Sequence, residues 1–309
     1  MTARTLTSLA IAVLAAAPAF ADAGVKAVER MFLERTAISA ADKSCNLFIE
    51  GERLALKSGL YQSEGELLRA NKNPAEIASL AAEVRVHAKA LGCDHPSVVE
   101  VAATIRSSYR QFVKTNFLEY PAKNSTWEAS RSKHDAWAVK QTNKKSGVIF
   151  GLRREDEEKP EEFVLAVAIP WDDIPPASVQ LNMRDAKKMA DPWLGKLFGA
   201  DIQMQPAARS VSRPEWAGKM EDWEDNVGDW YNIYYLPKIA VDRLEMLDPR
   251  EVVEFELTPS RKAKDKTPVK VVFEIGDFRA ARAFAMIPTP PVSQLATAAA
   301  AAPVKSGGH

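Results

Sequence analysis

Hydrophobic residues in the first third of the chain recur every three to four positions, which is the period of an amphipathic helix. The pattern covers residues 25–117 and predicts four helices. The second helix is expected over about residues 40–70. The third has clear end signals, because Asn73 can cap it, Pro74 suits its first position and Gly92 is placed to end it.

The fourth predicted helix follows the third after only a few residues. It begins at Pro96, with Asp94 or His95 as its cap. Such a short connection makes the two helices antiparallel neighbours in a small up-and-down bundle. We interpret the apolar stripes as facing one another in that bundle, because such stripes normally form a core. A partner-binding surface on the helices is the alternative.

Alternation with a period of two replaces the helical pattern after residue 125 and predicts strands. The expected elements are strands over 136–142, 147–152, 163–169, 179–183, 231–235, 252–257 and 269–275, a short helix over 237–247 and a last helix capped by Asp277. The acidic loop of residues 155–162 predicts a hairpin with a solvated tip. Short loops favour a mostly antiparallel sheet or sandwich. The expected fold class is therefore α+β, an N-terminal helical bundle followed by a mostly antiparallel, sandwich-like β-rich domain.

The start of the chain has the pattern of an export signal. A positive residue precedes an apolar run, and the small-x-small pattern of a cleavage site ends at Ala21. The run is shorter than the roughly 20 residues that cross a bilayer, so we favour cleavage over an anchor helix. The expected segments are a signal peptide over 1–21, a helical domain over 22–120, a β-rich domain over 125–288 and a disordered tail over 289–309. The expected location is periplasmic or secreted.

The chain has two cysteines, Cys45 and Cys93. In an oxidising compartment two distant cysteines predict a disulfide, and only one intramolecular pairing exists. A Cys45–Cys93 bond would close a loop of about 49 residues and stabilise the fold by roughly 4 kcal/mol. Two buried thiols or an intermolecular bond are the alternatives. The spacing excludes a CxxC redox motif, and nearby histidines add no standard zinc spacing.

Basic and acidic residues balance, with 41 of each and a formal net charge of zero. This balance gives no support for nucleic-acid binding or for docking on acidic membranes. An apolar fraction of 46% predicts a globular protein with a substantial core. No second segment is apolar and long enough to cross a bilayer, so the mature chain is expected to lack a transmembrane segment.

Two short motifs in the strand-rich half resemble a known family. The order of the predicted strands, the Ile169–Pro170 step and the closing run Phe278–Arg279–Ala280–Ala281 are similar to the invasion-associated locus B family of secreted bacterial proteins. The resemblance covers the second half of the chain, and the cysteines common in that family are missing there. It implies a fold and carries no function by itself.

No complete catalytic motif is present. Residues 130–133 match S-x-x-K, but the Ser-Asp-Asn and Lys-Thr-Gly partners of that acylase chemistry are absent. His134 beside Asp135 is interpreted as a surface pair. The acidic run of residues 221–229 offers oxygens for calcium but fails the EF-hand pattern, so we interpret it as a solvated loop. The sequence predicts no catalytic residue, no cofactor and no metal site.

Aromatic and acidic residues crowd between positions 216 and 235. The candidate ligand surface comprises Trp216, Trp223, Trp230, Tyr231, Tyr234, Tyr235, Asp222 and Asp225. Exposed rings beside carboxylates can stack on sugar faces, accept hydroxyl hydrogen bonds or anchor a protein interface. The competing interpretation is that the rings fill the core, where large aromatic residues are usually buried.

These features predict an exported protein of the cell envelope. We expect a non-enzymatic binding or structural module, whose partner is an envelope protein or a glycan. The alternative is a periplasmic hydrolase of glycans or peptides. In that hypothesis Glu221, Asp222 or Asp225 would act as paired carboxylates in an aromatic cleft.

Overall fold

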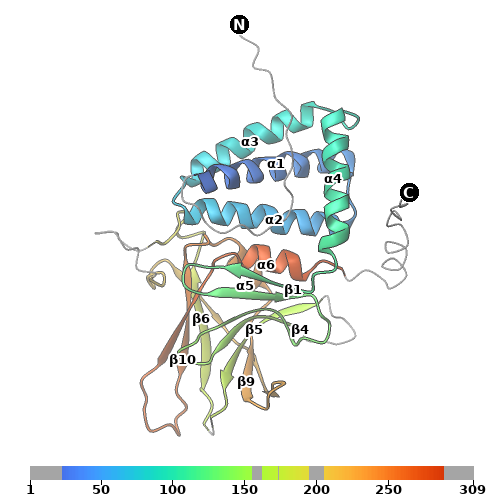
Figure 1. Cartoon of the computed structure of the whole chain (residues 1–309). Coiled ribbons are helices and arrows are strands. Elements are labelled where there is room, and N and C mark those ends of the chain that lie inside the picture. The colour runs from blue at the N-terminus through green and yellow to red at the C-terminus, as the bar shows by residue number, and fades with distance from the viewer. Residues whose placement is uncertain (1–22, 155–161, 173, 195–204, 289–309) are drawn as a thin grey trace, which may run out of the picture.

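The computed structural model describes residues 23–154, 162–172, 174–194 and 205–288. The expected signal peptide with its cleavage site at Ala21, most of the acidic loop of residues 155–162 and the expected tail of residues 289–309 lie outside the described residues. A layer of helices is stacked on one end of a strand-rich body (Figure 1). N-terminal helices followed by two antiparallel sheets confirm the predicted α+β class.

Four helices form the first layer. They are α1 (Ala23–Cys45), α2 (Glu50–Arg69), α3 (Pro74–Ala90) and α4 (Pro96–Phe112). Local sequence sets the starts of α3 and α4, as predicted. The side chains of Asn73 and His95 each accept a hydrogen bond from the backbone N–H two residues later, at 2.9 and 3.3 Å. A proline follows each cap at the first helical position.

The predicted start of the second helix near residue 40 is wrong, because α1 continues to Cys45. Asn46 then adopts a left-handed conformation with φ of 50°, which asparagine tolerates better than most residues. The carboxylate of Asp42 fixes this turn by accepting hydrogen bonds from the Phe48 N–H at 2.9 Å and from Arg53 at 2.7 Å. Periodicity did not show the break, because a short polar turn need not interrupt an apolar repeat.

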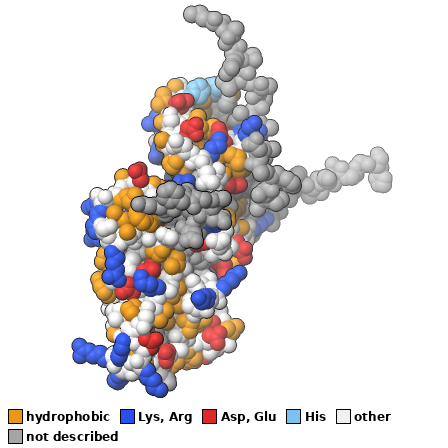
Figure 2. All heavy atoms as spheres, turned by 90° about the vertical axis from the view of Figure 1, so that its left-hand side faces the viewer, with side chains coloured by type: hydrophobic (Ala, Val, Ile, Leu, Met, Phe, Trp, Pro, Cys, Tyr) orange, Lys and Arg blue, Asp and Glu red, His pale blue; other side chains and the backbone are white. Residues whose placement is uncertain are grey.

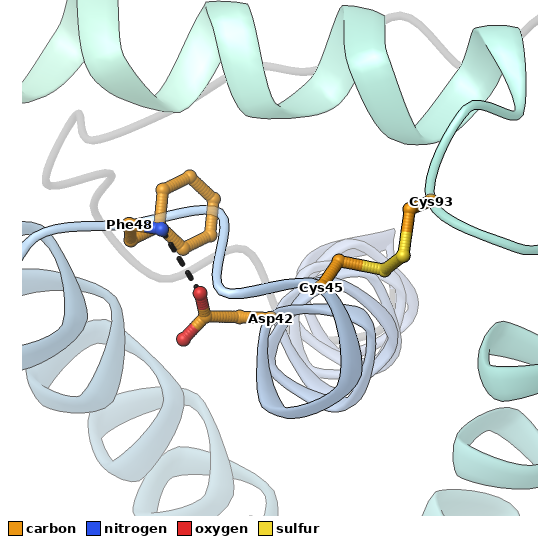
Figure 3. Close-up of a disulfide and its surroundings, with 4 residues drawn as sticks. All are labelled: Asp42, Cys45, Phe48 and Cys93. Carbon is orange, nitrogen blue, oxygen red and sulfur yellow. Dashed lines mark hydrogen bonds between the residues drawn. A yellow bond between two sulfur atoms is a disulfide. The ribbon is translucent and has the colours of Figure 1, made fainter.

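Cys45 and Cys93 form a disulfide, as predicted, with Cα atoms 5.4 Å apart. Cys45 is the last residue of α1, and Cys93 lies in the turn between α3 and α4 (Figure 3). The bond therefore holds the α3–α4 turn against the end of α1, whereas the sequence placed Cys45 near the start of the second helix. It links two points that are 48 residues apart in the chain.

The strand-rich body contains two antiparallel sheets and two helices. Its strands are β1 (Phe117–Pro121), β2 (Thr126–Ser130), β3 (Trp137–Thr142), β4 (Ile149–Arg154), β5 (Phe163–Pro170), β6 (Ser178–Arg184), β7 (Ser212–Trp216), β8 (Lys219–Glu224), β9 (Trp230–Tyr235), β10 (Val252–Thr258) and β11 (Val269–Glu274). The seven-stranded sheet has the order β1-β2-β3-β4-β5-β9-β8, and the four-stranded sheet has the order β11-β10-β6-β7. The helices are α5 (Ile239–Glu245) and α6 (Phe278–Ala285).

Strands β1, β2, β7 and β8 are not among those that the sequence predicts. β1 and β2 form a hairpin around residues 122–125, where the composition suggested a linker. β7 and β8 are rich in charged residues. Strands β1, β7 and β8 each lie at a sheet edge. Much of an edge strand faces solvent, so its sequence contains few of the alternating apolar residues by which a strand is predicted. Residues 221–224 of the acidic run predicted as a loop therefore belong to strand β8, and the remaining five residues connect it to β9.

The two sheets and α6 enclose one hydrophobic core. Trp127, Phe150 and Phe255 are fully buried there, and ring centroids lie 5.8 and 4.9 Å apart along this row. Leu54 and Ala55 of α2 belong to the same core. Figure 1 shows α6 between α2 and the strands. The helical layer and the strand-rich body are therefore packed together through α2 and α6.

Asp277 precedes α6 as predicted, but its side chain makes no capping hydrogen bond. Its carboxylate instead forms a two-point ion pair with the guanidinium of Arg69 on α2, with Nη2 and Oδ2 2.8 Å apart. The Asp277 side chain has no exposed surface. Burial raises the pKa of Asp277 to about 6, against the opposing influence of Arg69. The residue therefore ties α2 to α6.

Candidate functional site

The register of β8 and β9 separates the candidate ligand residues onto two faces. Trp223 pairs with Tyr231 across the strands, and Met220 pairs with Tyr234. Successive side chains of a strand point to opposite faces, so Trp223, Tyr231 and Tyr235 share one face while Tyr234 lies on the other. The eight predicted residues therefore do not form one continuous surface.

Tyr234 belongs to the core between the sheets. It is 6% exposed, and its hydroxyl donates to the carbonyl of Pro176 at 3.3 Å. Burial, followed by the charge of Asp222, raises the pKa of Tyr234 to about 12. For this residue the competing core interpretation is the observed one. Trp216 lies apart from it on β7 of the four-stranded sheet and is 54% exposed.

The other face of the seven-stranded sheet carries a small aromatic cluster. Trp137 of β3 and Trp223 of β8 contact each other with ring centroids 6.4 Å apart, although β4, β5 and β9 lie between their strands. Neighbouring strands are about 4.8 Å apart, so both rings must lean inward over the intervening strands. Ala166 and Ala168 of β5 leave room for this because they are small and fully buried.

Arg153 of β4 packs against this cluster. Its guanidinium lies over the rings of Trp223 and Tyr235, 5.5 and 5.9 Å from their centroids, and forms an ion pair with Glu221 at 2.8 Å. The Tyr235 hydroxyl also donates to Glu221. Glu221 is therefore held by a cation and a phenol. Asp222 is exposed and points to the opposite face of the strand, so these two adjacent acids do not converge on one substrate.

Asp225 has a structural role in the turn between β8 and β9. One carboxylate oxygen accepts hydrogen bonds from the N–H groups of Val227 and Asp229, each at 2.9 Å. Gly228 completes the turn with φ of 92°, a conformation that favours glycine. Burial, followed by the charges of Asp225 and Asp229, raises the pKa of the Tyr231 phenol. Among the described residues, no group of three or more His, Cys, Asp or Glu side chains is placed to hold a metal ion.

The most exposed aromatic feature of the seven-stranded sheet is a pair that we call the tryptophan pair, Trp171 and Trp230. Trp171 follows β5 directly, Trp230 begins β9, and the Trp171 N–H donates to the Trp230 carbonyl at 2.8 Å. The ring centroids are 6.3 Å apart in an edge-to-face arrangement, and each residue is 49% exposed. The backbone of two paired strands thus presents two half-exposed indoles side by side.

Sequence reasoning identified Trp230 but missed Trp171, Trp137 and Arg153. All seven tryptophans lie between residues 127 and 230, and that concentration was the available signal. It could not show which rings meet, because Trp171 and Trp230 become neighbours only through the pairing of β5 with β9.

The S-x-x-K segment, residues 130–133, ends β2 and enters a turn, so it lacks the helical turn that acylase chemistry needs. Arg131 within it is 4% exposed and donates to the carbonyls of Val113 at 2.8 Å and Thr115 at 3.0 Å, after α4. It also donates to Pro288 after α6, at 2.9 Å. A cation that binds the free carbonyls beyond two helix ends has a structural role.

Basic and acidic side chains are interspersed over the face drawn in Figure 2, in keeping with the neutral net charge. None of the described helices is long and apolar enough to cross a bilayer. No protein-family model, curated protein or solved structure matches the chain. The resemblance to the invasion-associated locus B family therefore supports no family assignment, and any functional conclusion rests on the chain's own geometry.

Proposed function

We propose that this chain is an exported protein of the cell envelope that binds a glycan through the tryptophan pair, without catalysis. The observation that carries the proposal is the half-exposure of two adjacent indoles, Trp171 and Trp230, on paired strand ends. Covering large apolar rings that otherwise contact water lowers the free energy, which favours binding of a ligand over them. A fixed backbone reduces the conformational entropy lost on binding.

The surroundings of the tryptophan pair favour a neutral ligand. Asp172 follows Trp171, Asp229 precedes Trp230, and Glu224 pairs with Trp230 across the β8–β9 ladder. These carboxylates repel polyanions such as nucleic acids and can accept hydrogen bonds from sugar hydroxyls. The flat indole faces suit the apolar C–H faces of pyranose rings. A neutral stretch of envelope glycan satisfies both requirements.

Replacing both tryptophans of the pair by alanine is expected to weaken glycan binding by about tenfold or more, because aromatic anchors dominate binding energy at such surfaces. The measurement is co-sedimentation of purified protein with insoluble envelope glycan over a range of glycan concentrations. Trp216→Ala is the matched control, since Trp216 is similarly exposed, at 54%, but lies on the other sheet.

The outcomes of this experiment separate the hypotheses. Equal retention of the Trp171→Ala/Trp230→Ala variant and the wild type would show that the pair is not the binding surface. Capture of an envelope protein that is lost with the pair while glycan binding is absent would replace the glycan by a protein partner. Release of soluble fragments from the glycan would contradict the non-catalytic part of the proposal.

Export is supported by the leader pattern in the sequence and by the disulfide, since stable disulfides form in oxidising compartments. The mature protein recovered from the periplasm or medium is expected to begin near Asp22, after cleavage at Ala21. N-terminal sequencing or intact-mass measurement checks this. Recovery of the unprocessed chain from the cytosol with two titratable thiols would contradict the expected location.

A further inference from the structure

A cavity of about 280 Å³ lies between one side of α5 and the ends of β6 and β7. Helix α5 contributes Ile239, Asp242 and Arg243, and Met246 follows it directly; these four residues recur at helical spacing and so share one side. Its other side carries residues such as Leu244, which is buried in the core. The strand ends contribute Arg184, Asp185, Ala186, Lys187 and Arg213.

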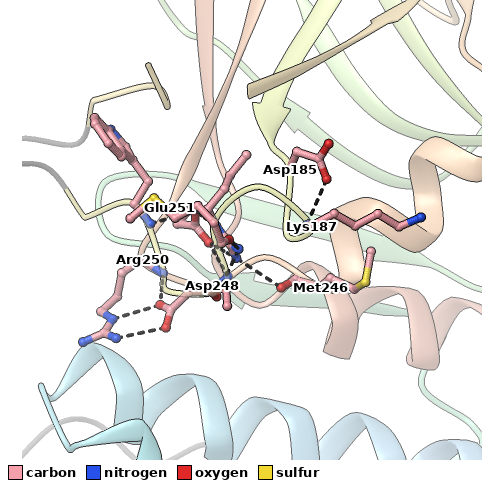
Figure 4. A network of polar contacts seen from close by, with 10 residues as sticks. Asp185, Lys187, Met246, Asp248, Arg250 and Glu251 are labelled. Atoms are coloured by element: carbon pink, nitrogen blue, oxygen red, sulfur yellow. Dashed lines mark hydrogen bonds and ion pairs between the residues drawn. The ribbon is translucent and has the colours of Figure 1, made fainter. Parts of the chain in front are cut away.

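The wall formed by Arg184 is rigid and electrically neutral. Its guanidinium makes a two-point ion pair with Glu251, at 2.7 and 2.9 Å, and donates to the Met189 carbonyl at 2.7 Å. The Glu251 carboxylate also accepts hydrogen bonds from the N–H groups of Trp193 and Asp248, at 3.0 and 2.8 Å. Figure 4 shows Glu251 within this network, which braces the cavity on one side.

The cavity also holds three cationic groups, Lys187, Arg213 and Arg243. Glu215 contacts Nη1 of Arg243 and lies 3.3 Å from Nε of Arg213, so one carboxylate forms ion pairs with two guanidinium groups. The Lys187 side chain extends away from the braced network (Figure 4), and its ammonium has no hydrogen bond or ion pair within the described part of the chain. These groups provide donors for a carboxylate.

The same cavity holds negative charge and apolar surface. The carboxylate of Asp242 has no hydrogen bond or ion pair with any residue that the structure describes, and Asp185 lies across the cavity from α5. Ile239 and Met246, at either end of the helix side, are 47% and 57% exposed. Asp185 accepts a hydrogen bond from the Lys187 N–H at 3.0 Å, whereas a simple anion would leave Asp242 unpaired and would be repelled by both acids. A ligand with charges of both signs and an apolar part matches all three features.

We propose that this cavity binds a small zwitterion, an amino acid with an apolar side chain. The ligand carboxylate is bound by Lys187 and the Arg213–Arg243 pair. The ligand ammonium is bound by Asp242 and Asp185, and the ligand side chain covers Ile239 and Met246. The volume is close to the lower end of small-molecule sites, about 300 Å³, and therefore favours a single residue over a longer peptide. The site is separate from the tryptophan pair, so either proposal can fail without the other.

Isothermal titration of the purified, disulfide-intact protein with L-leucine tests the proposal. Leucine is expected to bind with a dissociation constant below about 1 mM. N-acetylleucine, which lacks the ammonium, and leucinamide, which lacks the carboxylate, should each bind about tenfold more weakly or worse. Sodium sulfate at the same concentration should not compete with leucine, because the two acids repel a simple anion.

Substitutions of two exposed residues, Asp242 and Lys187, test which residue binds each charged group of the ligand. Asp242→Asn is expected to remove most of the preference for leucine over N-acetylleucine, and Lys187→Gln most of the preference for leucine over leucinamide. Glu119→Gln and Lys144→Gln, exposed charges on β1 and after β3, are matched controls that should bind like the wild type. Absence of binding by leucine, competition by sulfate, or equal binding of the blocked and free ligands overturns the proposal.

Discussion

Removal of the Cys45–Cys93 disulfide is expected to lower the free energy of unfolding by about 4 kcal/mol. The bond closes a loop between points 48 residues apart, and its loss restores that loop's freedom to the unfolded chain. A domain of ordinary stability has only about 5–15 kcal/mol in total, so the change should be large in any unfolding experiment.

The location of the bond determines which elements lose most when it is removed. It joins the end of α1 to the α3–α4 turn, and the buried set of α3 is small, comprising Ile77, Ala81 and Ala88. Without the bond, the outer helices are held by these contacts and by the smaller set from α4, Val98 and Ala102. We therefore expect α3 and α4 to lose protection against hydrogen exchange before the strand-rich body does.

Urea unfolding of the wild type, the reduced wild type and the Cys45→Ser/Cys93→Ser variant measures the effect. The reduced protein and the variant should share one lower midpoint, and the oxidised protein should run faster on a non-reducing gel. The tryptophan pair lies at the adjoining ends of β5 and β9, outside the helical layer, so glycan binding should persist in the reduced protein. Identical midpoints with and without reductant would contradict the prediction.

Replacement of Arg69 by methionine is expected to destabilise the protein by about 3 kcal/mol at pH 8, because it leaves the Asp277 carboxylate buried without its counter-ion. Asp277 has no exposed surface, while the Arg69 side chain is 18% exposed. The pair joins α2 to α6, so the loss acts on the contact between the helical layer and the strand-rich body.

The loss should depend on pH with a defined sign. Burial raises the pKa of Asp277 from 3.8 to about 6, so the folded protein binds this proton more tightly than the unfolded chain. Its contribution to stability therefore falls as the pH rises from about 4 to about 6 and stays at its lowest above that range. Arg69 offsets part of this penalty. In Arg69→Met the offset is lost, so the deficit relative to the wild type should be small at pH 4.5 and largest at pH 8.

Two controls isolate the pair. The Arg69→Met/Asp277→Asn variant should recover much of the loss and show no growth of the deficit between pH 4.5 and pH 8. Arg279→Met is the matched single variant, since Arg279 pairs with Glu64 across the same two helices but both side chains are about a third exposed. Its effect should stay below about 1 kcal/mol at either pH. An equal deficit for Arg69→Met at both pH values would show that Asp277 ionisation is not involved.

The sequence by itself determined the features that depend on neighbours in the chain. The starts of α3 and α4 follow from Asn73 and His95 with their prolines, because a cap needs only the next few residues. The disulfide followed from the leader pattern, which predicts an oxidising compartment, and its pairing followed from the cysteine count, because two cysteines allow one intramolecular pairing. The α+β class followed from the change of apolar period after residue 125, since that period reflects which face of each element is buried.

Only the tertiary structure decided how distant residues are used. The pairing of β5 with β9 brings Trp171 beside Trp230, while strand alternation sends Tyr234 into the core. Asp277 meets Arg69 across 208 positions in the sequence, so a residue with the local signal of a cap became half of a buried ion pair. Strand register and helix packing depend on the whole core, and no local pattern of residues specifies which side chains they bring together.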